Sequence, residues 1–373
     1  MRDLYLSNCE KNFVHRIVSD GHRLDGRTYN ESRPLNIAFG SQYGSCIVSL
    51  GETKVLAQVS CEVVQPKQIR PNEGLLYINV EMSPMAAPHI EANRQTDHAV
   101  HLNRMLEKAY KDSKCIDLES LCIVVEEKVW SLRVDVKILN HDGNLIEGAS
   151  IATVTALAHF KRPDVTRSGD SVIIHDIIEK DPIPTVLFHY PVCTTIAIFN
   201  SDILLADPNF LEESVCINGS VDEEATCGGL LVVGFNQYKE ICVMNLTGAA
   251  LSSTDIVCKA LQRSSDKCKE IVDLVKKAII SDDTLRRNRV KINFLDIITQ
   301  DHLQSLSKKD LNIKLKHYNI DDEVDDDVIT MDPDFDEEPS KYDVVASKPQ
   351  TAEIQTKKGA SKWIEISSDS EED

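Results

Sequence analysis

The spacing of apolar residues along the chain predicts strands and helices that recur in the same order in two halves. Two β-rich runs meet at Gly51-Glu52 within residues 45–64, which predicts a β-hairpin. From Leu132 to Ile138 every second residue is apolar, which is the period of a half-buried strand. Further strands are expected at residues 74–82, 192–200, 203–208, 230–236 and 240–246.

Four helices are predicted around these strands. Ser7 and Glu10 form a capping box at the start of the first helix, and Gly21 is expected to end it. Apolar residues at helical spacing predict a helix over 97–113 and a long one over 253–280. Residues 148–160 are rich in small side chains, which let a helix pack closely on a sheet. Because strands are followed by a helix in each half, we expect a mixed α+β protein.

The predicted elements and the composition between them divide the chain into five segments. A polar crossing with several prolines, from Pro163 to Pro184, separates the two halves. The segments are an N-terminal helix and lead-in (1–29), a first domain (30–163), a second domain (185–281), a basic extension (282–320) and an acidic tail (321–373). The tail is poor in aromatic residues, and its composition predicts disorder.

The charge of the chain is unevenly distributed. The formal net charge is −19, and residues 319–373 contribute −13 of it, from 18 acidic and 5 basic residues. The other 318 residues are therefore only mildly acidic, with −6. This balance does not exclude nucleic-acid binding by a local basic face.

The cysteines favour a reducing compartment. The chain has eleven, an odd number, and none is in a Cys-x-x-Cys pair, so neither a zinc site nor a disulfide framework is predicted. Cys46 is one of several that lie in apolar strand-like runs, where a thiol acts as a small hydrophobic group. No apolar run approaches the roughly 20 residues of a membrane span, and the N-terminus has no signal-peptide core. We therefore expect no metal, no cofactor and no membrane partner.

Several segments together carry a resemblance to a known family. Residues 23–60 contain Arg-x-Asp-Gly-Arg, then Arg-Pro, then Gly-x-Thr-x-Val at Gly51–Val55, and they resemble the start of the RNase PH family. The segments at 72–88, 102–123 and 134–157 continue the match, and they are most similar to the exosome ring subunits of the non-phosphorolytic branch.

The resemblance implies an RNase PH-like fold of two pseudo-symmetric βαβα-type halves. It also implies partners: other RNase PH-like subunits in a hetero-hexameric ring, cap subunits and associated nucleases, and single-stranded RNA. The locations it implies are nucleus, nucleolus and cytoplasm. Active members of the family cut RNA from its 3′ end with inorganic phosphate as the nucleophile.

The phosphate-binding turn of active members looks degenerate in this chain. Active members have Gly-Gly-Thr-Arg or Gly-Ser-Arg at the turn into the helix of small residues, where N–H groups, a hydroxyl and a guanidinium converge on phosphate. Here Ile146 and Glu147 stand where Thr and Arg would be. A carboxylate about 4 Å from a phosphate would repel it by several kcal/mol, and no cation nearby in the sequence compensates.

The acids of active members also look incomplete. Active members have two aspartates six positions apart, the second just after an acidic pair. With Glu212-Glu213 as that pair, Ser214 replaces the second acid, and Asp207 is the first acid if the register slips by one residue. A hydroxyl cannot serve as proton donor or strong metal ligand in place of a carboxylate. We therefore expect no catalytic residues. The alternative structural interpretation is a turn at Asp207-Pro208 with Glu212-Glu213 on a solvated face.

Arg104 and Lys108 are the strongest candidates for RNA binding. With Lys111 they fall on one face of the predicted helix, and related ring subunits resemble this chain in having basic residues at these two positions. An ordinary solvated helix face is the alternative. Arg94, Lys67 and Arg70 are weaker candidates. No aromatic residues alternate with these cations, so contact with the RNA backbone is expected rather than base stacking.

Two functions follow from these observations. The first is a non-catalytic exosome ring subunit that guides RNA for 3′→5′ processing and decay, including rRNA maturation. The alternative is an active phosphate-dependent 3′→5′ exoribonuclease. At the end of the chain, Ile364–Ile366 followed by serines and acids resembles a motif that binds SUMO, although a disordered acidic end explains it equally well.

Overall fold

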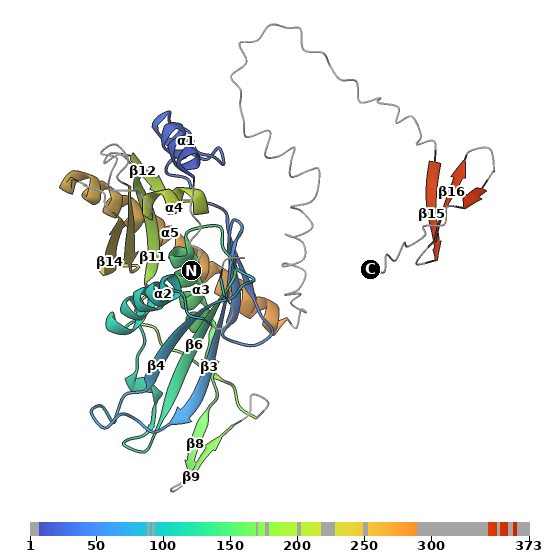
Figure 1. Ribbon diagram of the computed structural model, residues 1–373. Coiled ribbons are helices and arrows are strands. Elements are labelled where there is room, and N and C mark those ends of the chain that lie inside the picture. The colour runs from blue at the N-terminus through green and yellow to red at the C-terminus, as the bar shows by residue number, and fades with distance from the viewer. Residues whose placement is uncertain are drawn as a thin grey trace, which may run out of the picture. The chain divides into compact units, whose positions relative to one another are not determined.

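The structure is a computed structural model (Figure 1). It describes residues 7–87, 90–91, 94–168, 171–175, 179–199, 203–217, 228–248, 253–288, 342–348, 351–356 and 361–363. The chain divides into two units, Met1–Tyr318 and Asn319–Asp373, and each is described by itself. Among the described residues, no helix is long and apolar enough to cross a membrane.

The N-terminal helix α1 (Asn8–Ser19) confirms the predicted capping box. The Ser7 Oγ accepts a hydrogen bond from the Glu10 N–H at 3.3 Å, and the Glu10 carboxylate accepts one from the Ser7 N–H at 2.8 Å. The helix ends just before Gly21, whose φ of +91° lies in the left-handed region that favours glycine.

The first half is built on a six-stranded sheet. Its strands are β1 (Leu35–Phe39), β2 (Ser45–Leu50), β3 (Thr53–Val64), β4 (Leu75–Met82), β5 (Cys122–Val124) and β6 (Lys128–Asn140). Their order is β1-β2-β3-β6-β4, with β5 also on β6, and only the pairing of β4 with β6 is parallel. The β2–β3 turn confirms the predicted hairpin. Gly51 has φ +58° there, and a Cβ at this position would lie 2.6 Å from the Arg33 Cδ.

Two helices cover this sheet. Helix α2 (Asp97–Glu107) is capped by Thr96 and continues directly into a π-helical turn, η1 (Lys108–Asp112); a 3₁₀ turn, η2 (Glu119–Leu121), follows. Helix α3 (Leu145–His159) packs on β2 and β3 on one side and on β11 of the second half on the other. All its residues except Ala158 are buried, which explains why its sequence consists of small and apolar side chains.

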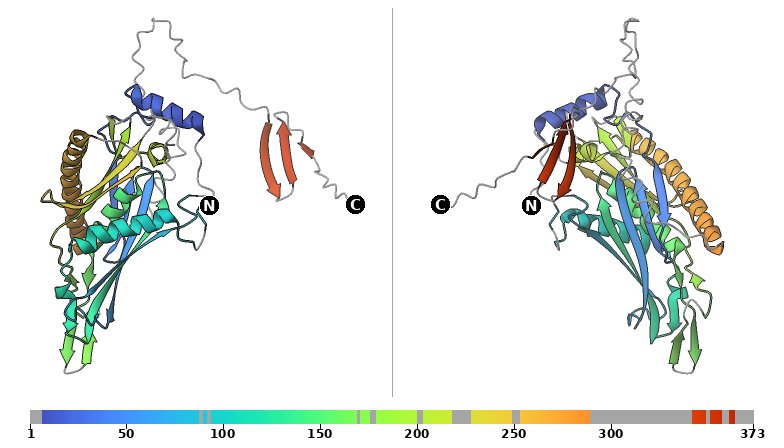
Figure 2. Two further views of the ribbon diagram at one scale, coloured as in Figure 1. Left: turned by 60° about the vertical axis from the view of Figure 1, so that its left-hand side comes forward. Right: turned by 90° about the vertical axis from the view of Figure 1, so that its right-hand side faces the viewer.

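The crossing between the halves contains short strands. These are β7 (Lys161–Arg162), β8 (Val165–Ser168), β9 (Ser171–Ile174) and β10 (Ile183–Pro184). Strands β8 and β9 pair with each other, and Figure 2 shows that they project from one end of the first half.

The second half is a four-stranded antiparallel sheet with two helices. Its strands are β11 (Val192–Phe199), β12 (Ile203–Ala206), β13 (Gly229–Phe235) and β14 (Ile241–Gly248), in the order β12-β11-β13-β14. The short helix α4 (Phe210–Ile217) was not predicted from the sequence. The long helix α5 (Thr254–Arg287) extends past residue 281, where the predicted second domain ends.

Both halves have the order strands, helix, strands, helix: β1–β4, α2, β5–β6, α3, and then β11–β12, α4, β13–β14, α5. The predicted α+β architecture of two similar halves is confirmed.

A buried histidine joins the ends of α3 and α5. The His159 Nδ1 accepts a hydrogen bond from the backbone N–H of Gly44 at 3.1 Å, so its Nε2–H donates to the Asp282 carboxylate at 3.0 Å. Asp282 in turn binds Arg286, which donates to the carbonyl of Ser41 at 2.8 Å. Burial lowers the pKa of His159 and outweighs the opposing effect of Asp282, so the ring is neutral in this arrangement.

The second unit contains three short strands: β15 (Tyr342–Lys348), β16 (Thr351–Thr356) and β17 (Ser361–Trp363). They pair antiparallel in the order β15-β16-β17. The acidic composition gave no indication of these strands, although runs such as Val344-Val345 favour extended structure. The rest of the tail, including Ile364–Ile366, and most of the predicted basic extension lie outside the described residues.

Candidate functional site

The segment Leu204–Ser214 lies where the two halves meet. Strand β12 ends at Ala206, Asp207 turns the chain with φ +50°, and α4 begins at Phe210. Asp207 and Glu212 are completely buried, and Glu213 is only 5% exposed. The prediction that Glu212-Glu213 forms a solvated face is therefore wrong. The reason is that donors from distant parts of the chain pair with these carboxylates: Arg23 binds Glu212, and the backbone N–H of Asn144 binds Glu213.

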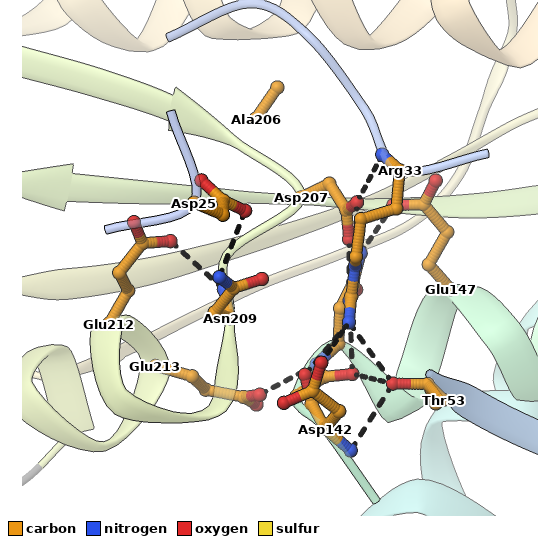
Figure 3. A network of polar contacts seen from close by, with 12 residues as sticks. Asp25, Arg33, Thr53, Asp142, Glu147, Ala206, Asp207, Asn209, Glu212 and Glu213 are labelled. Atoms are coloured by element: carbon orange, nitrogen blue, oxygen red, sulfur yellow. Dashed lines mark hydrogen bonds and ion pairs between the residues drawn. The ribbon is translucent and has the colours of Figure 1, made fainter. Parts of the chain in front are cut away.

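Arg33 binds the Asp207 carboxylate with both ends of its guanidinium group. The Nη2 lies 2.8 Å from Oδ1 and the Nε 3.0 Å from Oδ2, and the backbone N–H of Arg33 donates to Oδ2 at 2.8 Å. Figure 3 shows Arg33 beside Asp207. Arg27 adds an ion pair to Asp207 at 3.0 Å, and the Asn144 Nδ2 donates to Oδ1 at 2.6 Å. Burial alone would raise the pKa of Asp207, but Arg33 outweighs it and holds this pKa far below its usual range.

Arg33 also ties Asp207 to the turn before α3. Its Nη1 donates to the Asp142 carbonyl at 2.8 Å and to the Thr53 Oγ1 at 3.2 Å, and its Nη2 donates to the Gly143 carbonyl at 3.3 Å. One guanidinium group thus connects the segment just before β1, the β2–β3 hairpin, the turn before α3 and the turn after β12.

The predicted phosphate position at the start of α3 is filled by side chains of the protein itself. Ile146 is buried in the apolar core. Glu147 is completely buried; its carboxylate lies 2.6 Å from the Lys267 Nζ and accepts from the Asn144 Nδ2 at 2.8 Å. From the sequence, no cation was expected to compensate the charge of Glu147. Lys267 does so from α5, 120 residues later in the chain, so local spacing could not indicate it.

The N-terminal end of α3 holds a second carboxylate. The backbone N–H of Asn144, which caps the helix with φ +54°, donates to the Glu213 Oε2 at 2.8 Å. Burial raises the pKa of Glu213, against the lowering effects of this N–H and of Arg33. An anion from solution would have to displace this carboxylate to reach the same N–H.

Ser214, the residue at the position of the second acid, makes a local contact. Its Oγ donates to the Phe210 carbonyl at 2.7 Å, one turn earlier in α4. Its hydroxyl is thus used within the helix.

The Arg-x-Asp-Gly-Arg segment supplies further cations to this site. The guanidinium group of Arg23 binds the Glu212 carboxylate at 2.6 and 3.0 Å and donates to the Ala206 and Asp207 carbonyls at 3.0 and 2.9 Å. The Asn209 side chain joins Asp25 to Arg27, at 2.9 and 3.0 Å. The motif is visible in the sequence, but it gave no indication that its arginines pair with acids about 180 residues later in the chain.

We call this network the Arg33–Asp207 cluster. Its members are Asp25, Asp142, Glu147, Asp207, Glu212 and Glu213 with Arg23, Arg27, Arg33 and Lys267. Each cation already binds a carboxylate, and acids outnumber bases, so a phosphate ion would meet net repulsion. Among the described residues, no group of His, Cys, Asp and Glu side chains is arranged to hold a metal ion. The chemistry that the cluster supports is structural pairing between the two halves.

Arg104 and Lys108 lie outside this cluster, at the end of α2 and the start of η1. Both are exposed, and none of the ion pairs found between described residues involves either of them. Burial lowers the pKa of the neighbouring His101, and the charges of Lys108 and Arg104 lower it further. Arg104 and Lys108 are four residues apart in one continuous helical segment, which places them on the same face. The face therefore presents cations that are free to bind a further partner.

Comparisons with known proteins agree with this fold. Residues 31–163 match the family model for domain 1 of the 3′ exoribonuclease family (RNase PH), and residues 189–267 match the model for domain 2. The chain is 44% identical to the exosome complex component RRP45 of Homo sapiens over 304 residues, which are 81% of this chain and 67% of the relative. It is 42% identical to that of Danio rerio over 316 residues, 84% and 78% of the two chains. It is 32% identical to that of Saccharomyces cerevisiae over 298 residues, 77% and 95%.

Two solved structures share the fold. A chain of the Archaeoglobus fulgidus exosome with RNA bound to the active site has a TM-score of 0.60 at 24% identity, and it covers 71% of this chain and 97% of its own. A chain of an archaeal exosome core has a TM-score of 0.58 at 22% identity, and it covers 72% and 97%.

Proposed function

Because the chain belongs to the 3′ exoribonuclease family (RNase PH), we propose that it is a ring subunit of the RNA exosome with no phosphorolytic activity of its own. Its partners would be other RNase PH-like subunits in a hetero-hexameric ring, cap subunits, associated nucleases and single-stranded RNA. The curated relatives that carry the name exosome complex component support this proposal over an independent enzyme.

The observation that carries the absence of activity is the bidentate pairing of Asp207 with Arg33. A catalytic acid must be able to reach substrate, a metal ion or the leaving oxygen. The Asp207 carboxylate is completely buried and accepts hydrogen bonds on both oxygens. Glu147 and Glu213 supply negative charge where phosphate would have to bind.

The contribution of this chain to the ring would be RNA contact through Arg104 and Lys108. Both cations are exposed and lie four residues apart on one helical face, which suits binding to RNA phosphates without sequence preference. We propose that the ring acts in the nucleus, nucleolus and cytoplasm. Its processes would be rRNA maturation and RNA turnover.

Phosphorolysis assays on a reconstituted ring test the proposal. The ring is assembled from this chain and RNase PH-like partners whose own catalytic residues have been replaced, and it is incubated with end-labelled RNA and inorganic phosphate. No nucleoside diphosphate should be released. A ring with one catalytically intact partner is the positive control. Phosphate-dependent release that disappears with Asp207→Asn, while assembly persists, would favour the active enzyme instead.

A further inference from the structure

A second feature of the first half is a cavity of about 650 Å³ beside the π-helical turn η1. Its walls come from the loop before β4, the first residues of β4, the segment after η1, and Phe188 in the crossing between the halves. It shares no residue with the Arg33–Asp207 cluster.

Two aromatic side chains on different segments line this cavity. Tyr77 projects from β4 and is 46% exposed, and Phe188 is 57% exposed. The backbone holds Phe188 in place, because its N–H donates to the Cys115 carbonyl at 2.8 Å and Ile116 pairs with Leu187 in an antiparallel bridge. Both rings are therefore accessible to a ligand that can stack on an aromatic face.

Three lysines line the same cavity. Lys67, Lys111 and Lys114 are exposed, and none of the ion pairs found in the described part of the chain includes them. The carboxylates of the cavity are partly engaged: Glu73 binds Arg70 at 3.0 Å, and the Asp117 Oδ1 accepts the N–H groups of Glu119 and Ser120 at 3.1 and 3.3 Å.

The cavity and the proposed RNA contact share one helical segment, because Lys108 and Lys111 both belong to η1 and Lys111 lines the cavity. Lys111 follows Arg104 and Lys108 along the same helix, but it lies in the wider π-helical turn, so it departs from the face on which a regular α-helix would place all three. It lines the cavity together with Tyr77 and Phe188. Asp112 and Glu119 are the remaining lining carboxylates, so the lining as a whole has four basic and four acidic side chains and no net charge. The three lysines, which take part in no ion pair among the described residues, are the cations available to phosphate groups.

We propose that this cavity binds single-stranded RNA, with bases stacked on Tyr77 and Phe188 and phosphates against Lys67, Lys111 and Lys114. The inference rests on the proposed function, because it extends the RNA path from Arg104 and Lys108. Aromatic rings beside lysine ammonium groups suit a chain of bases and phosphates, and every base has a face that can stack. The sequence indicated only Lys67 and Arg70, as weaker candidates, and did not indicate the aromatic part of the site, because the two rings and the lysines come from four separate segments.

The test compares RNA with and without bases on the assembled ring. The affinity of an oligoadenylate is measured by fluorescence anisotropy for the wild-type ring, for Tyr77→Ala with Phe188→Ala, and for Tyr77→Phe. The double variant should raise the Kd by about 10-fold or more, since stacking on one base contributes about 5- to 150-fold in affinity. Tyr77→Phe should retain nearly full affinity because the ring remains. Met244→Ala, which changes an exposed apolar residue on β14, is the matched control.

An RNA of the same length with abasic sites separates stacking from charge. It should bind the wild-type ring more weakly than oligoadenylate, and the double variant should bind both RNAs with nearly equal affinity. Equal affinity of the wild-type and double-variant rings for oligoadenylate would overturn the inference. If that variant also loses a protein component of the purified complex, the cavity binds a protein instead of RNA.

The same experiment distinguishes failure of this inference from failure of the proposed function. A ring that assembles and loses RNA affinity on Arg104→Ala with Lys108→Ala, but not on the aromatic changes, refutes the cavity alone. A wild-type chain that does not enter the ring refutes the proposed function and the cavity with it.

Discussion

Replacing Asp207 by alanine should destabilise the protein strongly without removing any catalytic activity. The substitution leaves the guanidinium group of Arg33, whose side chain is only 6% exposed, without its bidentate partner. Removing one member of a buried ion pair typically costs about 3–5 kcal/mol, because the remaining charge is uncompensated. Arg33 would keep the Asp142 and Gly143 carbonyls and the weaker ion pair with Asp142 at 3.3 Å. We therefore expect a loss of about 3 kcal/mol, at the lower end of this range.

The measurement is urea unfolding of the purified ring at one fixed subunit concentration, because assembly stabilises the folded chain by mass action. Asp266→Ala is the matched control, since it removes an exposed carboxylate from an ion pair with Lys239 in which both side chains are more than half exposed. That variant should lose less than about 1 kcal/mol. Combining Asp207→Leu with Arg33→Met should recover part of the lost stability, because no unpaired charge remains.

The reasoning fails if Asp207→Ala costs no more than the control. It also fails if the Asp207→Leu, Arg33→Met combination is less stable than Asp207→Ala alone. In the first case the buried pair contributes little, and in the second the guanidinium group has enough other partners to be satisfied without Asp207.

Three further predictions concern charge. Because burial raises the pKa of Glu213, this group stabilises the folded state below its ordinary pKa of 4.5, and that contribution is lost as pH rises. In unfolding experiments, the gain in stability from Glu213→Gln should therefore be larger at about pH 7 than at about pH 4.5. Because the pKa of His159 is lowered, the stability of the protein should fall as pH drops from about 7 to about 5. The protonated ring can no longer accept a hydrogen bond from the N–H of Gly44. In thermal unfolding, His159→Gln should make stability depend less on pH. Alanine at both Arg104 and Lys108 should reduce the log–log salt slope of RNA binding by about 0.7 per lost contact, and an unchanged slope would return both to an ordinary solvated helix face.

Local sequence signals predicted much of the fold. The capping box of Ser7 and Glu10, the hairpin at Gly51-Glu52 and the alternation from Leu132 to Ile138 each depend on residues only a few positions apart. Such patterns act through local geometry and burial of one face, so they can be interpreted without knowing the tertiary structure.

The Arg33–Asp207 cluster could not be predicted in the same way. Glu212-Glu213 looks like a solvated acidic pair because its partners, Arg23 and the N–H of Asn144, lie 189 and 69 residues away. Lys267 reaches Glu147 from another helix. The cavity at Tyr77 and Phe188 was missed for the same reason. Burial of charge reverses the meaning of a polar residue, and only the three-dimensional pairing shows where this happens.

The distance between Arg33 and Asp207 along the sequence has a consequence for folding during synthesis. The two residues are 174 positions apart. At typical synthesis rates of 5–20 residues per second, Asp207 emerges roughly 10–35 s after Arg33. During that interval the guanidinium group cannot enter the interior with its bidentate acceptor. The first half, though complete in sequence by then, should remain open around the β2–β3 hairpin until α4 arrives. Nascent chains arrested before Asp207 should accordingly be cleaved by protease near Arg33, and those released after Phe210 should be protected.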